Sequence, residues 1–183
     1  GYEALFADVF KDEEEPLTYD NVAKAIGAFE RTLITVDRFD KFLAGDDTAM
    51  TETELKGYQT FVQSGCASCH NGALFGGSMY MKMGLINAYE NTHDLGRFAV
   101  TNNPADKYVF KVPSLRNITK TAPYFHDGAV AGLDEAVAQM AWMQLGRKLS
   151  DQEVSEIVAF LGALEDTHTI TVKYLNSGAE VGQ

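Results

Sequence analysis

The chain has 183 residues, of which 45% are hydrophobic and 22% are charged, an ordinary composition for one or two globular domains. Its formal net charge of −11 argues against a nucleic-acid-binding protein, because phosphate binding needs clustered Lys and Arg. No apolar run approaches the roughly 20 residues that cross a bilayer, and the N-terminal sequence lacks the basic and apolar regions of a secretory signal peptide.

Apolar residues with helical spacing predict a first helix over residues 18–33. The acidic run before it is interpreted as a solvated turn, and the segment after it as a short amphipathic stretch that ends at Gly45. Thr51 and Glu54 have the spacing of a capping box, which predicts that the next helix begins there and runs up to the two cysteines.

Residues 71–125 are rich in Gly, Asn and Thr and show little periodicity, so we expect a long loop region. Loops of this length are uncommon unless they serve a function. Helical spacing returns at Leu133, with Gly146 as the predicted end of that helix. A second capping box at Ser150 and Glu153 predicts one more helix.

The two cysteines of the sequence occur in Cys66-Ala67-Ser68-Cys69-His70. A thioredoxin-like C-x-x-C follows a strand, whereas the residues before Cys66 have a helical pattern, and a zinc site needs further Cys or His ligands. C-x-x-C-H is the attachment signature of haem c, in which both thiols bond to the haem and the histidine binds the iron. The motif therefore predicts one covalent haem c, with His70 as an axial ligand, in a protein exported to the periplasm.

The sixth iron ligand decides the chemistry, since a Met or His closes the iron for electron transfer and an open position admits peroxide. Spacing favours a methionine far from His70, because the chain must pass around the haem to reach its opposite face. Each candidate methionine or histidine can instead fill a gap in the core or lie at the surface. The candidates are Met50, Met79, Met81, Met83, Met140, Met143, His93, His126 and His168.

The order of elements predicts an all-α fold: a cytochrome c-like haem domain over residues 46–166, with a long loop-rich region that wraps the haem. Residues 1–45 have no place in such a domain and look like part of something else. In residues 167–183 an alternating stretch, "HTITVKY", predicts a short strand or an extended arm.

Several motifs together resemble the C-terminal haem domain of bacterial di-haem cytochrome c peroxidases. In chain order they are "LTYDNVAKAIGAFERTLIT", "GCASCHNG", "GRFAVTN", "FKVPSLRNI", "TAPYFHDGAV" and "LDEAVAQM". The resemblance covers most of the chain, and it implies that residues 1–45 form an interdomain segment, part of an N-terminal haem domain otherwise absent from this sequence. It also implies that Cys66 and Cys69 carry the thioether bonds, that His70 is the proximal ligand, and that Met140 is the axial methionine of the high-potential haem. A tyrosine takes that place in the related tryptophan-tryptophylquinone maturation enzymes, so Met140 favours a peroxidase.

The same resemblance implies further site residues. His126 matches a histidine near the haem propionates that the family uses in coupling between its two haems. Thr121 and Pro123 match positions whose backbone carbonyls help to bind calcium between the domains, and carbonyl oxygens suit this hard cation. Arg97 and Arg116 lie in matching motifs, and we expect them to pair with the propionates.

The chain departs from the family in one respect: the second C-x-x-C-H and the peroxidatic haem that it carries are absent from the sequence. The resemblance therefore implies part of a cytochrome-c peroxidase, an oxidoreductase that reduces hydrogen peroxide to water. This part would accept electrons from a small cytochrome c or cupredoxin and pass them to the N-terminal peroxidatic haem domain, in a homodimer. The alternative is a stand-alone monohaem electron-transfer cytochrome.

Overall fold

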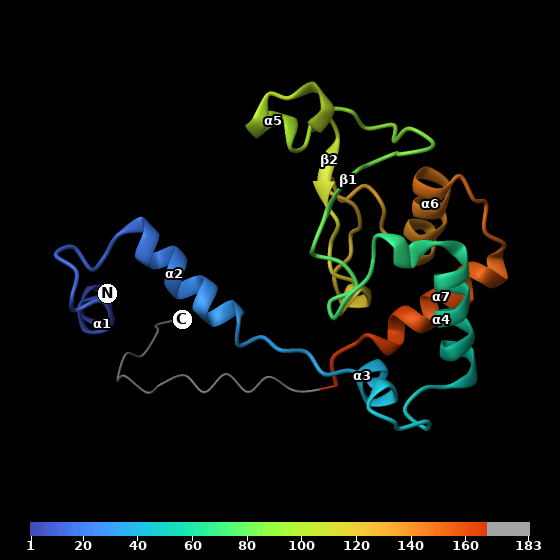
Figure 1. Cartoon of the computed structure of the whole chain (residues 1–183), viewed down its shortest axis with the longest axis horizontal. Coiled ribbons are helices and arrows are strands. Elements are labelled where there is room, and N and C mark those ends of the chain that lie inside the picture. The colour runs from blue at the N-terminus through green and yellow to red at the C-terminus, as the bar shows by residue number, and fades with distance from the viewer. Residues whose placement is uncertain (168–183) are drawn as a thin grey trace. The chain divides into compact units, whose positions relative to one another are not determined.

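The computed structural model describes residues 1–167 (Figure 1). These residues divide into two compact units, residues 1–35 and residues 36–167. Within the described residues, no helix combines the length and the apolar character that crossing a membrane requires.

The first unit contains two helices, α1 (Glu3–Val9) and α2 (Tyr19–Glu30). Helix α2 begins after Thr18, whose hydroxyl accepts a hydrogen bond from the amide of Asn21 at 3.2 Å. The buried Asn21 side chain donates to Glu13 at 2.7 Å and to the carbonyl of Pro16 at 2.9 Å. The acidic run is therefore folded against the start of α2, and α1 is a helix that the sequence pattern did not predict.

The first unit leaves most of its apolar side chains exposed. The stripe that predicted α2 contacts no apolar core within the described residues, although the helix itself is present, ending at Glu30. The exposed side chains, each at least 42% accessible, are Tyr2, Leu5, Val9, Leu17, Tyr19, Ile26, Phe29, Leu33 and Ile34. A surface of this kind is typical of a segment that packs against another protein surface.

The second unit is built on α3 (Arg38–Leu43), α4 (Glu52–Ser64), α6 (Leu133–Leu145) and α7 (Asp151–Ala163). Helices α4 and α7 lie side by side (Figure 1). They meet at Gly57, where an added Cβ would lie 1.9 Å from the carbonyl oxygen of Glu156. Aromatic and aliphatic side chains fill the core: Phe39, Met50, Phe61, Phe75, Leu115, Ile157, Phe160, Leu161, Ala163 and Leu164.

The predicted helix boundaries of this unit are confirmed. Thr51 with Glu54, and Ser150 with Glu153, form complete capping boxes at the starts of α4 and α7. Gly146 ends α6 in the left-handed conformation, with φ of +66°.

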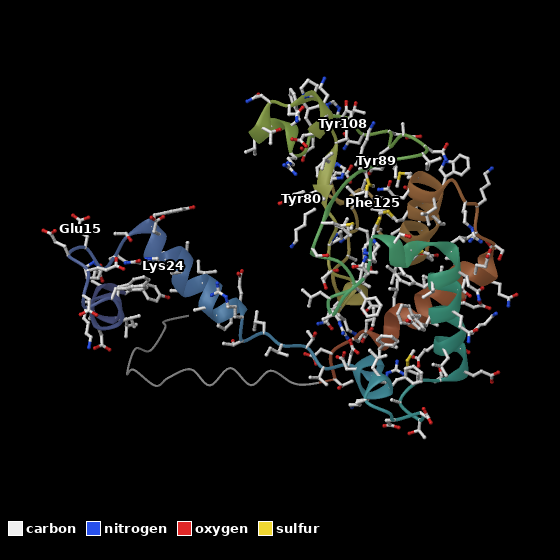
Figure 2. All side chains as sticks on the ribbon, in the orientation of Figure 1. Glu15, Lys24, Tyr80, Tyr89, Tyr108 and Phe125 are labelled. Atoms are coloured by element: carbon white, nitrogen blue, oxygen red, sulfur yellow. The ribbon has the colours of Figure 1, made fainter. Side chains whose placement is uncertain are left out.

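Residues 71–125 are mostly loop, as expected, with short elements that the sequence did not reveal. Strands β1 (Tyr80–Lys82) and β2 (Val109–Lys111) pair antiparallel, with Met81 opposite Phe110. The α5 turn (Phe98–Thr101) and the 3-10 turns η2 (Pro104–Asp106) and η3 (Ile118–Lys120) complete the region. Figure 2 shows the side chains of Tyr80, Tyr89 and Tyr108 around these strands. Two three-residue strands leave the class all-α, as predicted.

The second unit begins at Val36, ahead of the boundary that the sequence indicated at residue 46. The reason is α3: its Phe39 is 2% exposed in the core, and Asp37 forms a β-bridge with Asp166. The stretch "HTITVKY" begins at residue 168 and lies outside the described residues.

Candidate haem-binding site

Helix α4 ends at the C-x-x-C-H motif. Gly65 closes the helix in the left-handed conformation with φ of +97°, and the 3-10 turn η1 (Cys66–Ser68) follows. The amides of Cys69 and His70 both donate to the carbonyl of Cys66, at 3.3 and 3.0 Å. This tight turn brings both thiols and the imidazole to one short segment, and neither cysteine is in a disulfide.

The imidazole of His70 is held by one ring nitrogen. Its Nδ1 lies 3.2 Å from the carbonyl oxygen of Phe75, so a proton on Nδ1 donates to that oxygen and leaves the Nε2 lone pair free. Burial lowers the pKa of His70, and this effect is larger than the opposing one of the Phe75 and Pro113 carbonyls, which raise the pKa. A neutral imidazole with a fixed tautomer is the form that binds iron.

The loop after the motif closes tightly over His70 at Gly76. This glycine has φ of +129°, and an added Cβ would lie 2.1 Å from the carbonyl oxygen of Pro113 and 3.4 Å from Nδ1 of His70. Only glycine allows both the backbone conformation and this approach. The sequence shows Gly76 as one glycine of a loop, and nothing in its pattern distinguishes this position from Gly77.

The two thiols and the imidazole fit a covalent haem c. Burial raises the pKa of the Cys66 thiol to about 11, so it is a protonated thiol rather than an exposed reactive thiolate. The donor set of two free thiols with an adjacent neutral imidazole matches what the haem vinyl groups and the iron require. Within residues 1–167, no cluster of three His, Cys, Asp or Glu side chains offers a conventional metal site.

Met140 lies in the middle of α6 and is half-buried. Three residues before it on the same helix, Val137 packs against the core cluster that also contacts Cys66 and Ala67. Met143 is buried at 4% exposure, and its carbonyl oxygen accepts the amides of Ile86 and Asn87. The structure thus makes Met143 a core residue and leaves the assignment of Met140 as iron ligand a prediction.

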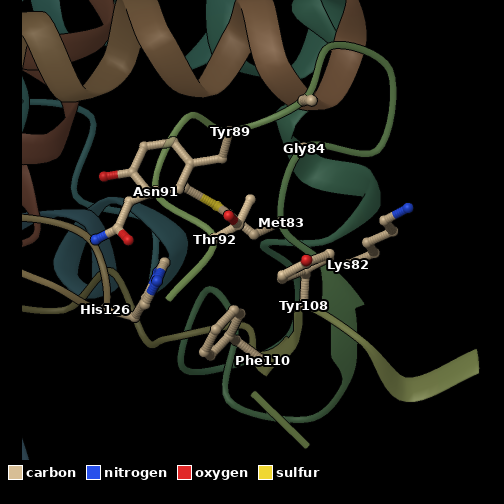
Figure 3. A pocket seen from close by; sticks show the side chains of 10 residues that line it. Lys82, Met83, Gly84, Tyr89, Asn91, Thr92, Tyr108, Phe110 and His126 are labelled. Carbon is tan, nitrogen blue, oxygen red and sulfur yellow. The ribbon is translucent and has the colours of Figure 1, made fainter. Parts of the chain in front are cut away.

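His126 lies at a cavity of about 100 Å³ (Figure 3). Its ring stacks on Phe110 with centroids 4.1 Å apart and meets Tyr89 edge-on at 5.6 Å. The neighbouring Asp127 accepts hydrogen bonds from the Tyr89 hydroxyl at 2.9 Å and from Asn91 at 2.8 Å. Burial and the bonds to Asp127 raise the pKa of Tyr89 to about 12.

The two arginines of the predicted site have different surroundings. Arg97 is half-exposed, with its Nε 3.5 Å from Asp106 and its guanidinium 5.3 Å from the Tyr80 ring centroid. Arg116 is 9% exposed and contacts Asp37, Asp40 and the carbonyl of Ala73. Since these contacts occupy its donors, the expected pairing of Arg116 with a propionate would require it to release one of them.

The two residues predicted to bind calcium lie between η3 and the β-bridge of Tyr124. Thr121 directly follows η3, and its hydroxyl donates to the carbonyl of Ile118 at 3.1 Å. Pro123 follows a cis peptide bond, and the next residue, Tyr124, pairs with Val130 in a β-bridge. The carbonyl ligands remain a prediction.

Sequence reasoning missed several residues that hold the motif in place. Phe75 supplies the carbonyl that accepts from His70, and Asp37 and Asp40 bind Arg116. A buried carboxylate far along the chain from its partner leaves no periodic signal in a sequence. The Asp37–Asp40 spacing of a capping box was the one available indication, and the structure contains that box.

Comparison with known proteins gives the class of this fold. Residues 55–165 match the cytochrome c family, and residues 1–48 match the di-haem cytochrome c peroxidase family. The chain therefore belongs to the cytochrome c family, a class defined by covalently bound haem c.

Individual relatives point to a narrower group of proteins within this class. The chain is 50% identical over 165 residues to the cytochrome c551 peroxidase of Nitrosomonas europaea, covering 89% of this chain and 49% of that protein. It is 45% identical over 168 residues to the cytochrome c551 peroxidase of Pseudomonas aeruginosa, with the same coverage. These relatives confirm the predicted relationship to bacterial cytochrome c peroxidases, an oxidoreductase family. The chain spans about half the length of both.

A solved structure agrees with this relationship. The fold matches a MauG-like protein associated with microbial copper homeostasis, with a TM-score of 0.74 and 28% identity, over 91% of this chain and 59% of that one.

Proposed function

We propose that this chain is the electron-accepting part of a periplasmic cytochrome-c peroxidase that reduces hydrogen peroxide to water. The observation that carries the proposal is the C-x-x-C-H turn, with two free thiols and with the Nδ1 of His70 bound to the Phe75 carbonyl. In this role Cys66 and Cys69 bond to the haem, Nε2 of His70 binds the iron, and Met140 supplies the sixth ligand. When bound, the haem supplies one-electron redox chemistry at a closed iron.

The chain's own residues exclude water and fix ligands in this role. The Phe75 carbonyl keeps the Nδ1 proton of His70 in place, so that the imidazole has one orientation and one tautomer. Phe61 and Phe75 of the core, together with the half-buried Cys66 and Ala67, form apolar surroundings for the motif. Low polarity around the haem favours a high reduction potential, which suits a haem that accepts electrons.

The exposed apolar side chains of the first unit favour part of a larger enzyme over a stand-alone monohaem carrier. Ile26, Phe29 and Leu33 on or just after α2 have no apolar core to join within the described residues. A separate carrier has no need of such a surface, whereas a peroxidatic haem domain would cover it. We propose that domain as the principal partner, with electrons supplied by a small cytochrome c or cupredoxin.

The remaining parts of the proposal rest on the resemblance to peroxidases. They are calcium at the carbonyls of Thr121 and Pro123, an inter-haem role for His126, a propionate contact for Arg97, and a homodimer. For His126, the supporting observation is that stacking on Phe110 fixes the imidazole ring beside a cavity.

The test is production of the chain with the haem c attachment machinery in the bacterial periplasm. We expect an intact mass that corresponds to one covalent haem, a low-spin spectrum of His/Met type, and reduction by a small c-type cytochrome or cupredoxin. A product without haem, or one with a high-spin open iron, would contradict the proposal.

A further inference from the structure

The guanidinium of Arg116 joins two segments of the second unit. Arginine has five N–H donors, and here each has an acceptor. Nε and Nη2 both donate to the carbonyl of Ala73, at 3.0 and 2.8 Å. Nη2 also donates to Asp40 at 2.8 Å, and Nη1 donates to Asp40 at 3.1 Å and to Asp37. With its side chain 9% exposed, this is a buried, fully bonded ion pair.

The carboxylates that bind Arg116 are themselves fixed. Asp37 is fully buried and caps α3, accepting from the amide of Asp40 at 2.9 Å, while Asp40 accepts from the amide of Asp37 at 3.2 Å. Because each carboxylate is held by the other residue's backbone, neither can follow a displaced guanidinium. Helix α3 therefore acts as a rigid anchor for Arg116.

On its other side, Arg116 holds the loop that follows the haem motif. Besides bonding the Ala73 carbonyl, its guanidinium carbon lies 5.4 Å from the Phe75 ring centroid. The neighbouring Ser114 donates its hydroxyl proton to the carbonyl of Leu74 at 2.7 Å. Residues 73–75 are thus held at every position by residues 114–116.

The held loop ends at the carbonyl that binds His70. Phe75 has a left-handed backbone with φ of +50°, a conformation that costs energy for a bulky residue and persists only where neighbours impose it. Its carbonyl oxygen lies 3.2 Å from Nδ1 of His70. The position of this oxygen sets the length of that hydrogen bond, and the bond sets how strongly the imidazole donates to a metal.

We propose that Arg116 is a positioning residue for the axial histidine: anchored on Asp37 and Asp40, it holds residues 73–75 so that the Phe75 carbonyl keeps its hydrogen bond to His70. This inference rests on the proposed binding of haem iron by His70. The consequence is a lowered reduction potential, because a hydrogen bond donated by Nδ1–H makes the imidazole more electron-donating and stabilises the ferric state.

The test is the Arg116→Lys variant of the full chain with haem attached. Lysine keeps the positive charge beside Asp37 and Asp40, so the potential does not change through loss of charge, but its ammonium cannot bind both carboxylates and Ala73. We expect a midpoint potential more positive than in the wild type and altered low-spin EPR g values. We also expect the amides of Leu74 and Phe75 to exchange hydrogen about tenfold faster or more.

The matched control is Arg38→Lys. Arg38 lies on α3, as Asp40 does, and forms a bidentate ion pair with Glu54. None of its hydrogen bonds within the described residues reaches residues 73–75. Its substitution should lower thermal stability and leave the potential and the g values at wild-type values. Equal shifts in both variants, or no shift in Arg116→Lys, would overturn the inference.

A second variant covers the case in which Arg116→Lys does not fold. Ser114→Ala removes the uncharged bond to the Leu74 carbonyl and should move the potential in the same direction by a smaller amount; an unchanged potential would then overturn the inference. The covalent haem is measured first, by mass, in the wild type. Its absence there contradicts the proposed function, whereas a haem-loaded protein without these shifts contradicts only the role of Arg116.

Discussion

At the scale of single residues, the site depends on groups that fix the motif rather than on the motif alone. The imidazole of His70 is neutral and oriented because it is buried and bound to the Phe75 carbonyl. Gly76 permits the loop to approach that imidazole. In the proposed function, Met140 is the residue whose ligation of the iron would separate an electron-transfer haem from one that is open to peroxide.

Met140→Ala should remove the sixth ligand while leaving the haem attached. We expect the low-spin spectrum to be replaced by that of an open or water-ligated iron, measured by absorption and EPR of the haem-loaded protein. Met143→Ala is the control, since Met143 is buried in the core and should lose about 2–5 kcal/mol of stability with no change in iron spin state. The converse pattern would assign the ligand to Met143.

Tyr89 provides a pH prediction. Burial first, and then its bonds to the Asp127 carboxylate, raise the pKa of this hydroxyl to about 12 from an ordinary value near 10. Because the folded pKa lies above the unfolded one, the stabilisation is complete below about pH 10 and is lost as pH rises towards 12. The difference in tyrosinate absorption between wild type and Tyr89→Phe should have its midpoint near 12. A midpoint near 10 would contradict the described surroundings of Tyr89, its burial and its bonds to Asp127 together.

At the scale of elements, the close packing of α4 on α7 positions the haem motif. Gly57 is the point of contact, and α4 carries the motif at its C-terminal end. A helix that could move relative to α7 would shift Cys66 and His70 together. The fit of these two helices is therefore a structural requirement of the site.

Gly57→Ala should be destabilising by about 1–3 kcal/mol or more, because the new methyl group would collide with the Glu156 carbonyl. Chemical denaturation measures the change. Gly162→Ala on α7 is the matched control: an added Cβ meets nothing within 4 Å there, so alanine should stabilise the helix by up to about 1 kcal/mol. Equal effects of the two variants would contradict this packing.

The sequence predicted the elements that local signals define. Both capping boxes and the C-terminal glycine of α6 lie where the spacing indicated, because a cap depends on residues within one turn of each other. The strand pair was missed, since Tyr80–Lys82 and Val109–Lys111 are three residues each and distant along the chain. For the candidate site, C-x-x-C-H was sufficient to predict His70, whereas the contacts of Phe75 and of the Asp37–Arg116 pair are tertiary and no local pattern records them.

At the scale of the whole molecule, three features support the proposal that this chain works together with a peroxidatic haem domain. It spans about half of its peroxidase relatives, it contains one C-x-x-C-H, and its first unit exposes an apolar surface. Its net charge of −11 favours an electron donor with a basic patch, so donor reduction should slow as salt is added.

The measurement that tests the central proposal most directly is the reoxidation of the reduced haem by hydrogen peroxide. The haem-loaded chain is reduced, mixed with peroxide in a stopped-flow instrument, and compared with the same chain joined to the part of the Nitrosomonas europaea relative that it does not cover. We predict that the haem of the chain alone stays reduced over the time in which the joined protein is oxidised and consumes peroxide. Equally fast oxidation of the chain alone would show that peroxide reacts at this haem and would contradict the proposal.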